Sequence, residues 1–301
     1  MTPPQPPAAW HQLPDVHAFL DRAGPYLHAA PALHTVQLTV TDALRRNGPD
    51  AFGGGPPRYG ILTADGQVHG TMVRTPPRGA LVSVTPPPGA PPGPFLTAAA
   101  ESLAETHPEL PGLTAPDETA TVFAGAWQRR TGAVPRPQTH ERLYALADLA
   151  MPRPAPPGRA RPAAPADHAL LTRWFTEFAE AIGEPLSRDP APWAEDRIAQ
   201  GRTLLWETPD GTPVSLAGCS PEIAGQVRVG PVYTPAGLRG RGYAGAVTAE
   251  LSRRLTGTTA RDILLFTDLA NPTSNALYQR IGYRPLRDFT VYAFDPGPET
   301  E

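Results

Sequence analysis

Residues 231–244 read Pro231-Val232-Tyr233-Thr234-Pro235-Ala236-Gly237-Leu238-Arg239-Gly240-Arg241-Gly242-Tyr243-Ala244. This segment runs from an apolar strand through a Gly-rich turn into a helical pattern that continues to Leu255. The first N–H groups of a helix have no partner inside the helix, and the helix dipole makes that end positive. Glycines let the backbone approach an anion closely. The stretch therefore predicts a site for the diphosphate of a nucleotide-like cofactor.

The spacing of the charged and small residues narrows the choice of cofactor. A Walker loop would need Lys followed by Ser or Thr after its second glycine, and neither is present. The spacing Gly-x-Gly-x-x-Gly of a dinucleotide fingerprint is present at Gly240, Gly242 and Gly245, so NAD is an alternative on this turn alone. NAD is kept as the weaker alternative because the downstream segment described next favours another cofactor. The better match is the pattern Arg239-x-x-Gly242-x-Ala244.

A second segment with candidate site residues follows downstream. Residues 262–268 form an apolar run of strand length, and Asn271-Pro272 then has the pattern of a helix N-cap followed by proline at the first helical position. Asn275 and Tyr278 are three residues apart and would share one face of that helix. A tyrosine hydroxyl stays protonated at neutral pH and can donate a proton.

In this order, the two segments resemble the acyl-CoA site of the GNAT-type N-acetyltransferases, whose diphosphate loop reads Gln/Arg-x-x-Gly-x-Gly/Ala. The resemblance covers residues 159–294 and ends with a strand at 289–294. It implies that acetyl-CoA is the co-substrate, that an amine accepts the acetyl group, and that Tyr278 is the general acid. The cofactor-binding residues that it implies are Val232, Tyr233, Thr234, Arg239, Gly240, Arg241, Gly242, Tyr243, Ala244, Asn271 and Asn275.

The general base is where the sequence departs from the family pattern. Many members carry a glutamate on the strand before the loop, but residues 225–230 contain no carboxylate. Three acidic residues, Asp268, Glu177 and Glu222, are candidates for the base, and Glu180 on the same predicted helix as Glu177 is a fourth. A water relay is equally compatible with the sequence.

The chain also repeats itself. Asp-Gly turns at 65–66 and 210–211 each separate two alternating runs typical of a β-hairpin. Three further matches are Val84-Thr85-Pro86 with Tyr233-Thr234-Pro235, Trp127-Gln128-Arg129 with Tyr278-Gln279-Arg280, and Leu143-Tyr144-Ala145-Leu146 with Val291-Tyr292-Ala293-Phe294. The four features recur in one order at an offset of about 150 residues, which predicts two copies of one fold.

The first copy differs where the cofactor chemistry is expected. Ala90 stands at the position of Arg239, and Trp127 stands at the position of Tyr278. Residues 86–94 are rich in proline, which has no N–H to offer a diphosphate. We therefore expect a degenerate first copy that keeps the fold without the cofactor loop, an arrangement similar to tandem GNAT proteins, including actinobacterial ones.

The predicted fold class is α/β (α+β): two tandem GNAT-like domains, each with a mixed, mostly antiparallel sheet flanked by helices. Composition suggests five segments: a disordered tail at 1–9, the degenerate domain at 10–150, a Pro-rich linker at 151–162, the acetyltransferase domain at 163–296 and a disordered tail at 297–301.

Composition also limits the classes of partner and location. The net charge is −3 and gives no reason to expect nucleic acid or a basic membrane patch. No apolar run approaches the ~20 residues that span a bilayer, and no secretory leader or metal-binding spacing is seen, so no metal is expected. The expectation is a cytoplasmic enzyme acting on a small-molecule or peptide amine, and the internal tandem favours a monomer. The alternative is a non-enzymatic acyl-CoA-binding or protein-interaction module with a vestigial active site.

Overall fold

The computed structural model describes residues 8–183 and 189–296, which divide into two compact units. Unit 1 holds residues 8–142, 268–270 and 287–296, and unit 2 holds 143–183, 189–267 and 271–286. Of the two predicted tails, residues 1–7 and 297–301 lie outside the described residues. Ala9, predicted to be in the first tail, instead begins a strand and pairs with Thr63.

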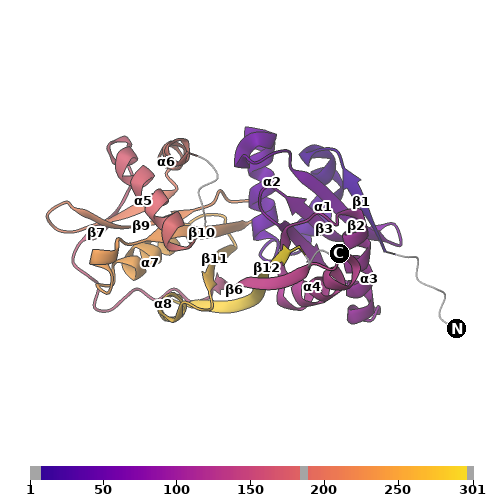
Figure 1. Ribbon diagram of the computed structural model, residues 1–301. Helices are drawn as coiled ribbons and strands as arrows, with labels where there is room; N and C mark the ends of the chain where they lie inside the picture. The colour runs from indigo at the N-terminus through magenta and orange to yellow at the C-terminus, as the bar shows by residue number, and fades with distance from the viewer. Residues whose placement is uncertain (1–7, 184–188, 297–301) are drawn as a thin grey trace. The chain divides into compact units, whose positions relative to one another are not determined.

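Unit 1 is a sheet with helices on both faces (Figure 1). Its elements are β1 (Ala9–Leu13), α1 (Val16–Ala29), α2 (Thr35–Asn47), β2 (Arg58–Ala64), β3 (Gln67–Arg74), β4 (Ala80–Val84), α3 (Pro92–Thr106), β5 (Gly112–Pro116) and α4 (Asp117–Thr131). The strand order is β1-β2-β3-β4-β5, antiparallel except for the parallel pair β4–β5. The hairpin predicted at Asp65-Gly66 is confirmed, with both turn residues at positive φ.

Unit 2 repeats this arrangement. Its elements are β7 (Arg159–Pro162), α5 (His168–Ala181), α6 (Pro190–Ala199), β8 (Thr203–Glu207), β9 (Pro213–Cys219), β10 (Gln226–Tyr233), α7 (Tyr243–Leu255), β11 (Asp262–Asp268) and α8 (Pro272–Arg280). The strand order is β11-β10-β9-β8-β7, again with one parallel pair, β10–β11. The end of the predicted linker is β7, which pairs with β8 along its whole length.

Alternation along the strands builds two core layers in unit 2. On β8, Leu204 and Trp206 belong to the core beneath α7 and α8, whereas Leu205 belongs to the core beneath α5 and α6. Successive side chains of a strand point to opposite faces, so one strand supplies both layers. The sheet is thereby buried on both faces, and the carboxyl end of β10 lies between two helical layers.

Two long strands pass from one unit to the other. β6 (Val134–Leu146) leaves unit 1 after Arg142, and its last four residues belong to unit 2. β12 (Tyr283–Asp295) begins in unit 2, and residues 289–293 pair with β5 of unit 1. The strand predicted at 289–294 therefore exists, but it completes the sheet of the first unit. The contact units thus differ from the predicted domains, which were divided at a single linker.

Candidate functional site

The Gly-rich segment forms an open turn at the start of α7. Gly240 and Gly242 have φ values of 77° and 82°, a region that side-chain-bearing residues rarely adopt. Gly242 is the N-cap of α7, so no side chain caps the first N–H groups of the helix. Residues 239–242 are all exposed. The turn therefore presents uncapped helix N–H groups to solvent, as an anion site requires.

The two arginines of this turn frame the helix start. Arg239 Nε donates to the carbonyl of Thr234 at 3.0 Å, and Arg241 Nη2 reaches the carbonyl of Gly237 at 3.4 Å. These bonds fold both side chains back over the loop while leaving the residues exposed. Two guanidinium groups thus lie on a turn whose backbone is already favourable to negative charge.

β10 and β11 separate just before the turn. Their parallel pairing joins only Gln226–Arg228 to Asp262–Leu264. On the other edge of β10, the register with β9 shifts between Val229 and Val232. Successive residues of a strand direct their N–H groups to opposite edges. Within Val232–Thr234, at least one N–H therefore faces the edge that β11 has left.

One predicted base lies beside this opening. Tyr233 is the last residue of β10, and its hydroxyl donates to Glu177 Oε2 of α5 at 2.8 Å. Glu177 also lies 3.7 Å from Arg173 on the same helix. Burial raises the pKa of Tyr233, and the Glu177 carboxylate raises it further, while Arg239 lowers it. Glu177, Tyr233 and Arg239 thus form one electrostatic group at the end of β10.

The other acidic candidates make different contacts. Glu222 precedes β10 and accepts from Thr259, so the length of the strand separates it from the loop. Asp268 accepts from the N–H of Ala270 in the turn after β11, and its residue is grouped with unit 1. Glu180 is exposed near the end of α5. Glu177 is thus the candidate that is bonded to Tyr233 at the carboxyl end of β10, whereas Glu222 precedes that strand and Asp268 ends the parallel strand β11.

Helix α8 carries the second predicted segment. Asn271 is its N-cap and accepts from the N–H of Ser274 at 3.0 Å. Tyr278 is 9% exposed and meets the ring of Tyr283 edge-on, and burial raises its pKa to about 12. Among the described residues, no hydrogen-bond partner is found for its hydroxyl, and the hydroxyl oxygen is not completely buried. The hydroxyl is therefore protonated at neutral pH and can donate to a ligand.

Two features near these residues escaped sequence reasoning. Tyr144 of β6 donates to Asn275 Oδ1 at 2.8 Å, although the sequence marked Tyr144 only as part of the repeat. The Pro-rich segment also lies along the start of α7, because a Cβ on Gly242 would be 3.9 Å from the Pro156 ring. Both contacts join residues far apart in sequence, so no local sequence pattern predicts them.

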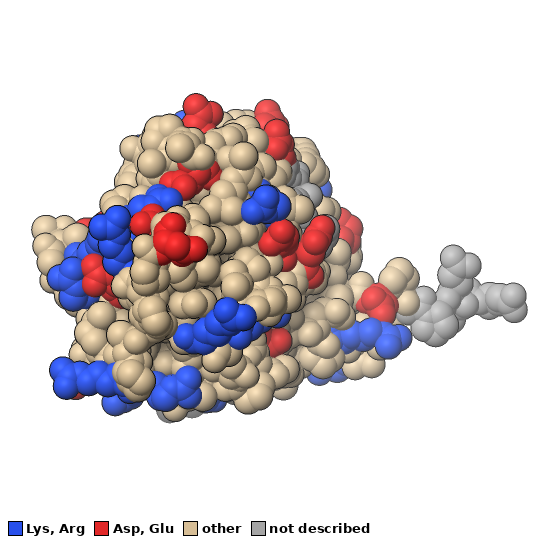
Figure 2. Space-filling view, turned by 90° about the vertical axis from the view of Figure 1, so that its left-hand side faces the viewer, with Lys and Arg blue, Asp and Glu red and all other residues tan. Residues whose placement is uncertain are grey.

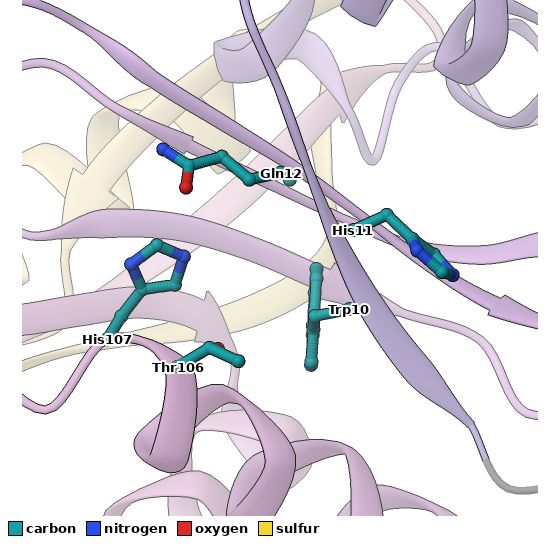
Figure 3. Close-up of a pocket in the computed structure, with 6 residues that line it drawn as sticks. Trp10, His11, Gln12, Thr106 and His107 are labelled. Atoms are coloured by element: carbon teal, nitrogen blue, oxygen red, sulfur yellow. The ribbon is translucent and has the colours of Figure 1, made fainter.

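A separate pocket of about 270 Å³ lies in unit 1. It is lined by Trp10, His11, Gln12, Gly60, Thr106 and His107. Figure 3 shows Trp10 and Gln12 extending from one side of β1 toward His107, while His11 extends from the other side. Burial lowers the pKa of His107. No predicted site residue lies in this pocket.

On the face drawn in Figure 2, arginines and acidic side chains are interspersed. Across residues 8–183 and 189–296, no group of His, Cys, Asp or Glu side chains could hold a metal ion. No helix in that part of the chain is long and apolar enough to cross a membrane.

Comparison with known proteins supports the fold. Residues 223–292 match the family model described as FR47-like protein. No curated protein matches the chain significantly. A GCN5-related N-acetyltransferase from Sphaerobacter thermophilus is similar at 20% identity and a TM-score of 0.60, with 97% of this chain and 98% of that chain covered.

Two further solved structures match nearly the whole chain. A GNAT-family acetyltransferase from Colwellia psychrerythraea has 12% identity and a TM-score of 0.58, covering 95% of this chain and 99% of that one. A tandem GNAT protein from the clavulanic acid biosynthesis pathway has 12% identity and a TM-score of 0.58, covering 97% and 100%. With the repeated units described above, the chain is a tandem GNAT-fold protein whose FR47-like match lies in its second half.

Proposed function

We propose that the chain is an acetyl-CoA-dependent N-acetyltransferase that works from unit 2 and acetylates the amine of a small molecule or peptide. The observation that carries the proposal is the exposed turn 239–242. It combines two arginines, two glycines at positive φ and an uncapped helix start. These groups fit the diphosphate of a CoA thioester, because backbone N–H groups and guanidinium groups both bind phosphate oxygens.

When bound, acetyl-CoA supplies the acyl group as an activated thioester. In this proposal the N–H groups at the end of β10 donate to the thioester oxygen, where negative charge develops. Asn275 bonds the pantetheine arm, and Tyr278 gives its proton to the departing sulfur. Tyr278 suits that role because it keeps its proton far above neutral pH, with a pKa of about 12.

Glu177 is the base that the geometry favours. An attacking amine must lose a proton, and a carboxylate can accept it directly or through the Tyr233 hydroxyl to which Glu177 is bonded. Its position next to Tyr233 places it at the end of β10, beside the proposed thioester site. The proposed location remains the cytoplasm, with a monomeric chain.

The alternative is an acyl-CoA-binding module without catalysis. It is favoured by the absence of a carboxylate along Gln226–Tyr233 and by the contacts of Glu177 with Tyr233 and Arg173. A module of this kind would bind acetyl-CoA and leave it intact in the presence of every amine offered.

Calorimetric titration with acetyl-CoA tests the proposal. We expect one site per chain, with affinity lowered about 100-fold in Arg239→Glu because a repelling charge replaces a cation. Arg22→Glu is the matched control, since it makes the same charge change on an exposed residue of α1 in unit 1. NAD should not bind.

The outcomes separate the candidates. Loss of binding in Arg239→Glu alone supports the loop as the cofactor site, and an amine screen that releases CoA then supports the enzyme over the module. Absence of acetyl-CoA binding at millimolar concentration would contradict both. Two sites per chain would contradict a degenerate first copy.

A further inference from the structure

Tyr144 reaches unit 2 from the half of the chain that precedes the Pro-rich segment. It lies near the end of β6, after that strand has left unit 1. Its side chain is 0% exposed and belongs to the core that contains Tyr278 and Tyr283. A buried tyrosine usually needs a partner for its hydroxyl, and here the partners come from α8.

The hydroxyl of Tyr144 stands in the middle of a chain of hydrogen bonds. Gln279 Nε2 donates to the Tyr144 oxygen at 3.1 Å, and Tyr144 donates to Asn275 Oδ1 at 2.8 Å. Asn275 Nδ2 in turn donates to the carbonyl of Asn271 at 2.8 Å. The donors in this series of hydrogen bonds therefore all point the same way, from Gln279 to Asn271, the N-cap of α8.

This direction determines how the amide of Asn275 is turned. A backbone carbonyl can only accept, so the amide nitrogen must face Asn271 and the amide oxygen must face Tyr144. If the amide were reversed, Asn275 Oδ1 would face the carbonyl oxygen of Asn271, and both of these atoms are acceptors. The reversed amide would also set a second donor against the Tyr144 oxygen, which already accepts from Gln279. Tyr144 and Asn271 thus hold the amide in one orientation.

The matched position in unit 1 lacks this arrangement. Tyr292 is the counterpart of Tyr144 in the repeat, but the residue that matches Asn275 is Ala124. Ala124 offers no side-chain group to a hydroxyl, and it lies in the apolar core of unit 1. The tyrosine–asparagine pair therefore occurs in the unit with the Gly-rich turn and is missing from the unit without it.

We propose that Tyr144 is a positioning residue, contributed by the first half of the chain, that orients the Asn275 amide for the pantetheine arm of acetyl-CoA. The inference rests on the proposed function of unit 2. Tyr144 acts through Asn275, and the orientation of that amide decides whether its nitrogen or its oxygen faces a ligand.

The test compares two buried tyrosines of unit 2. Tyr144→Phe removes the hydroxyl that reaches Asn275, and Tyr283→Phe removes one that is bonded to Ser252 at 2.8 Å instead. We expect Tyr144→Phe to lower the affinity for acetyl-CoA about 10-fold, because one well-placed hydrogen bond is lost. Tyr283→Phe should leave that affinity unchanged. Adenosine 3′,5′-bisphosphate, which lacks the pantetheine, should bind all three proteins equally.

A milder variant and a double mutant keep the test decisive. Gln279 is exposed, so the Gln279→Ala variant should fold. It should lower the affinity for acetyl-CoA about 3-fold, because the Tyr144 hydroxyl can then rotate away from Asn275. In an Asn275→Ala background, Tyr144→Phe should add no further loss, because the residue through which it acts is gone.

The failures are distinguishable. A wild-type protein that does not bind acetyl-CoA would remove the proposed function itself. Wild-type binding that Tyr144→Phe and Gln279→Ala leave unchanged would overturn the role of Tyr144 and spare the proposed function. Equal losses for acetyl-CoA and for adenosine 3′,5′-bisphosphate would also overturn it, since they would indicate a general disturbance of the unit.

Discussion

The two units place a helix after a strand in the same way, but they begin that helix with different residues. In unit 1, β4 and β5 pair in parallel only at Ala80 and Leu81, and α3 then starts behind Pro91 with proline in its first turn. In unit 2, β10 and β11 separate similarly, and α7 starts behind Gly242. Proline removes N–H donors from the helix start, whereas glycine leaves them available. The same architecture thus keeps the N–H donors at the helix start in unit 2 and replaces most of them by proline in unit 1.

The comparison extends to the second predicted segment. Trp127 of α4 occupies the position that matches Tyr278 of α8, and it stacks on Phe294 with ring centroids 5.0 Å apart. Trp127 is fully buried and serves the core. Tyr278 meets Tyr283 by its ring while its hydroxyl has no partner among the described residues. One position therefore supports packing in unit 1 and an available proton donor in unit 2.

The largest expected effect comes from cutting the chain between the predicted domains. A fragment of residues 163–296 lacks the end of β6, where Tyr144 is buried. It also lacks Ala147 and Ala150 just after that strand, which donate to the carbonyls of Gly282 and Ile281. Loss of a buried aromatic residue costs about 3–5 kcal/mol, a large part of the usual 5–15 kcal/mol of total stability. We expect the fragment to show no cooperative thermal unfolding by circular dichroism.

The full chain is the control for this fragment. A fragment that unfolds cooperatively and binds acetyl-CoA as tightly as the full chain would show that unit 2 does not depend on the first half. It would also contradict the contribution of Tyr144.

The next effect concerns the proton donor of unit 2. Tyr278→Phe removes the hydroxyl and keeps the ring contact with Tyr283, so turnover should fall about 100-fold or more while acetyl-CoA affinity is retained. Burial raises the pKa of Tyr278 from 10.0 to about 12, so the folded protein keeps this proton between those pH values. Turnover should therefore show no loss from Tyr278 ionisation below about pH 11.

Steady-state kinetics across that pH range provide the measurement, and Trp127→Phe in unit 1 provides the comparison. Trp127→Phe should lower thermal stability through its lost contact with Phe294 and leave kcat per folded molecule unchanged. Unchanged turnover in Tyr278→Phe would remove this residue from the mechanism.

A smaller effect is expected at the base. Glu177→Gln keeps an acceptor for the Tyr233 hydroxyl but cannot take up a proton, so kcat should fall about 10- to 100-fold with acetyl-CoA affinity retained. Glu222→Gln changes the same chemistry before β10, beside Thr259, and should have no effect on kcat. A larger loss in Glu222→Gln than in Glu177→Gln would reverse the assignment.

Local signals predicted the parts of this structure that depend on neighbouring residues. The Asp-Gly hairpin, the Gly-rich turn and the Asn271 cap all follow from residues within a few positions of one another. The exchange of β6 and β12 between units does not, because pairing between distant strands leaves no trace in a short window. The preference for Glu177 over Glu222 likewise depended on topology, because Glu177 of α5 bonds Tyr233 at the carboxyl end of β10 and Glu222 precedes that strand.

The smallest expected effect tests the turn itself against a matched glycine. Gly242→Ala places a side chain at φ 82° at the start of α7, and Gly132→Ala does the same at φ 73° at the end of α4 in unit 1. Both should lose a similar stability, about 1–2 kcal/mol, because alanine resists positive φ. Only Gly242→Ala should lower the affinity for acetyl-CoA, by about 3- to 10-fold, because the strained backbone shifts the N–H groups that face the diphosphate. Equal binding by the two variants, measured by calorimetry beside thermal unfolding, would mean that the turn is a structural device in both units, and the contrast between them would then concern packing alone.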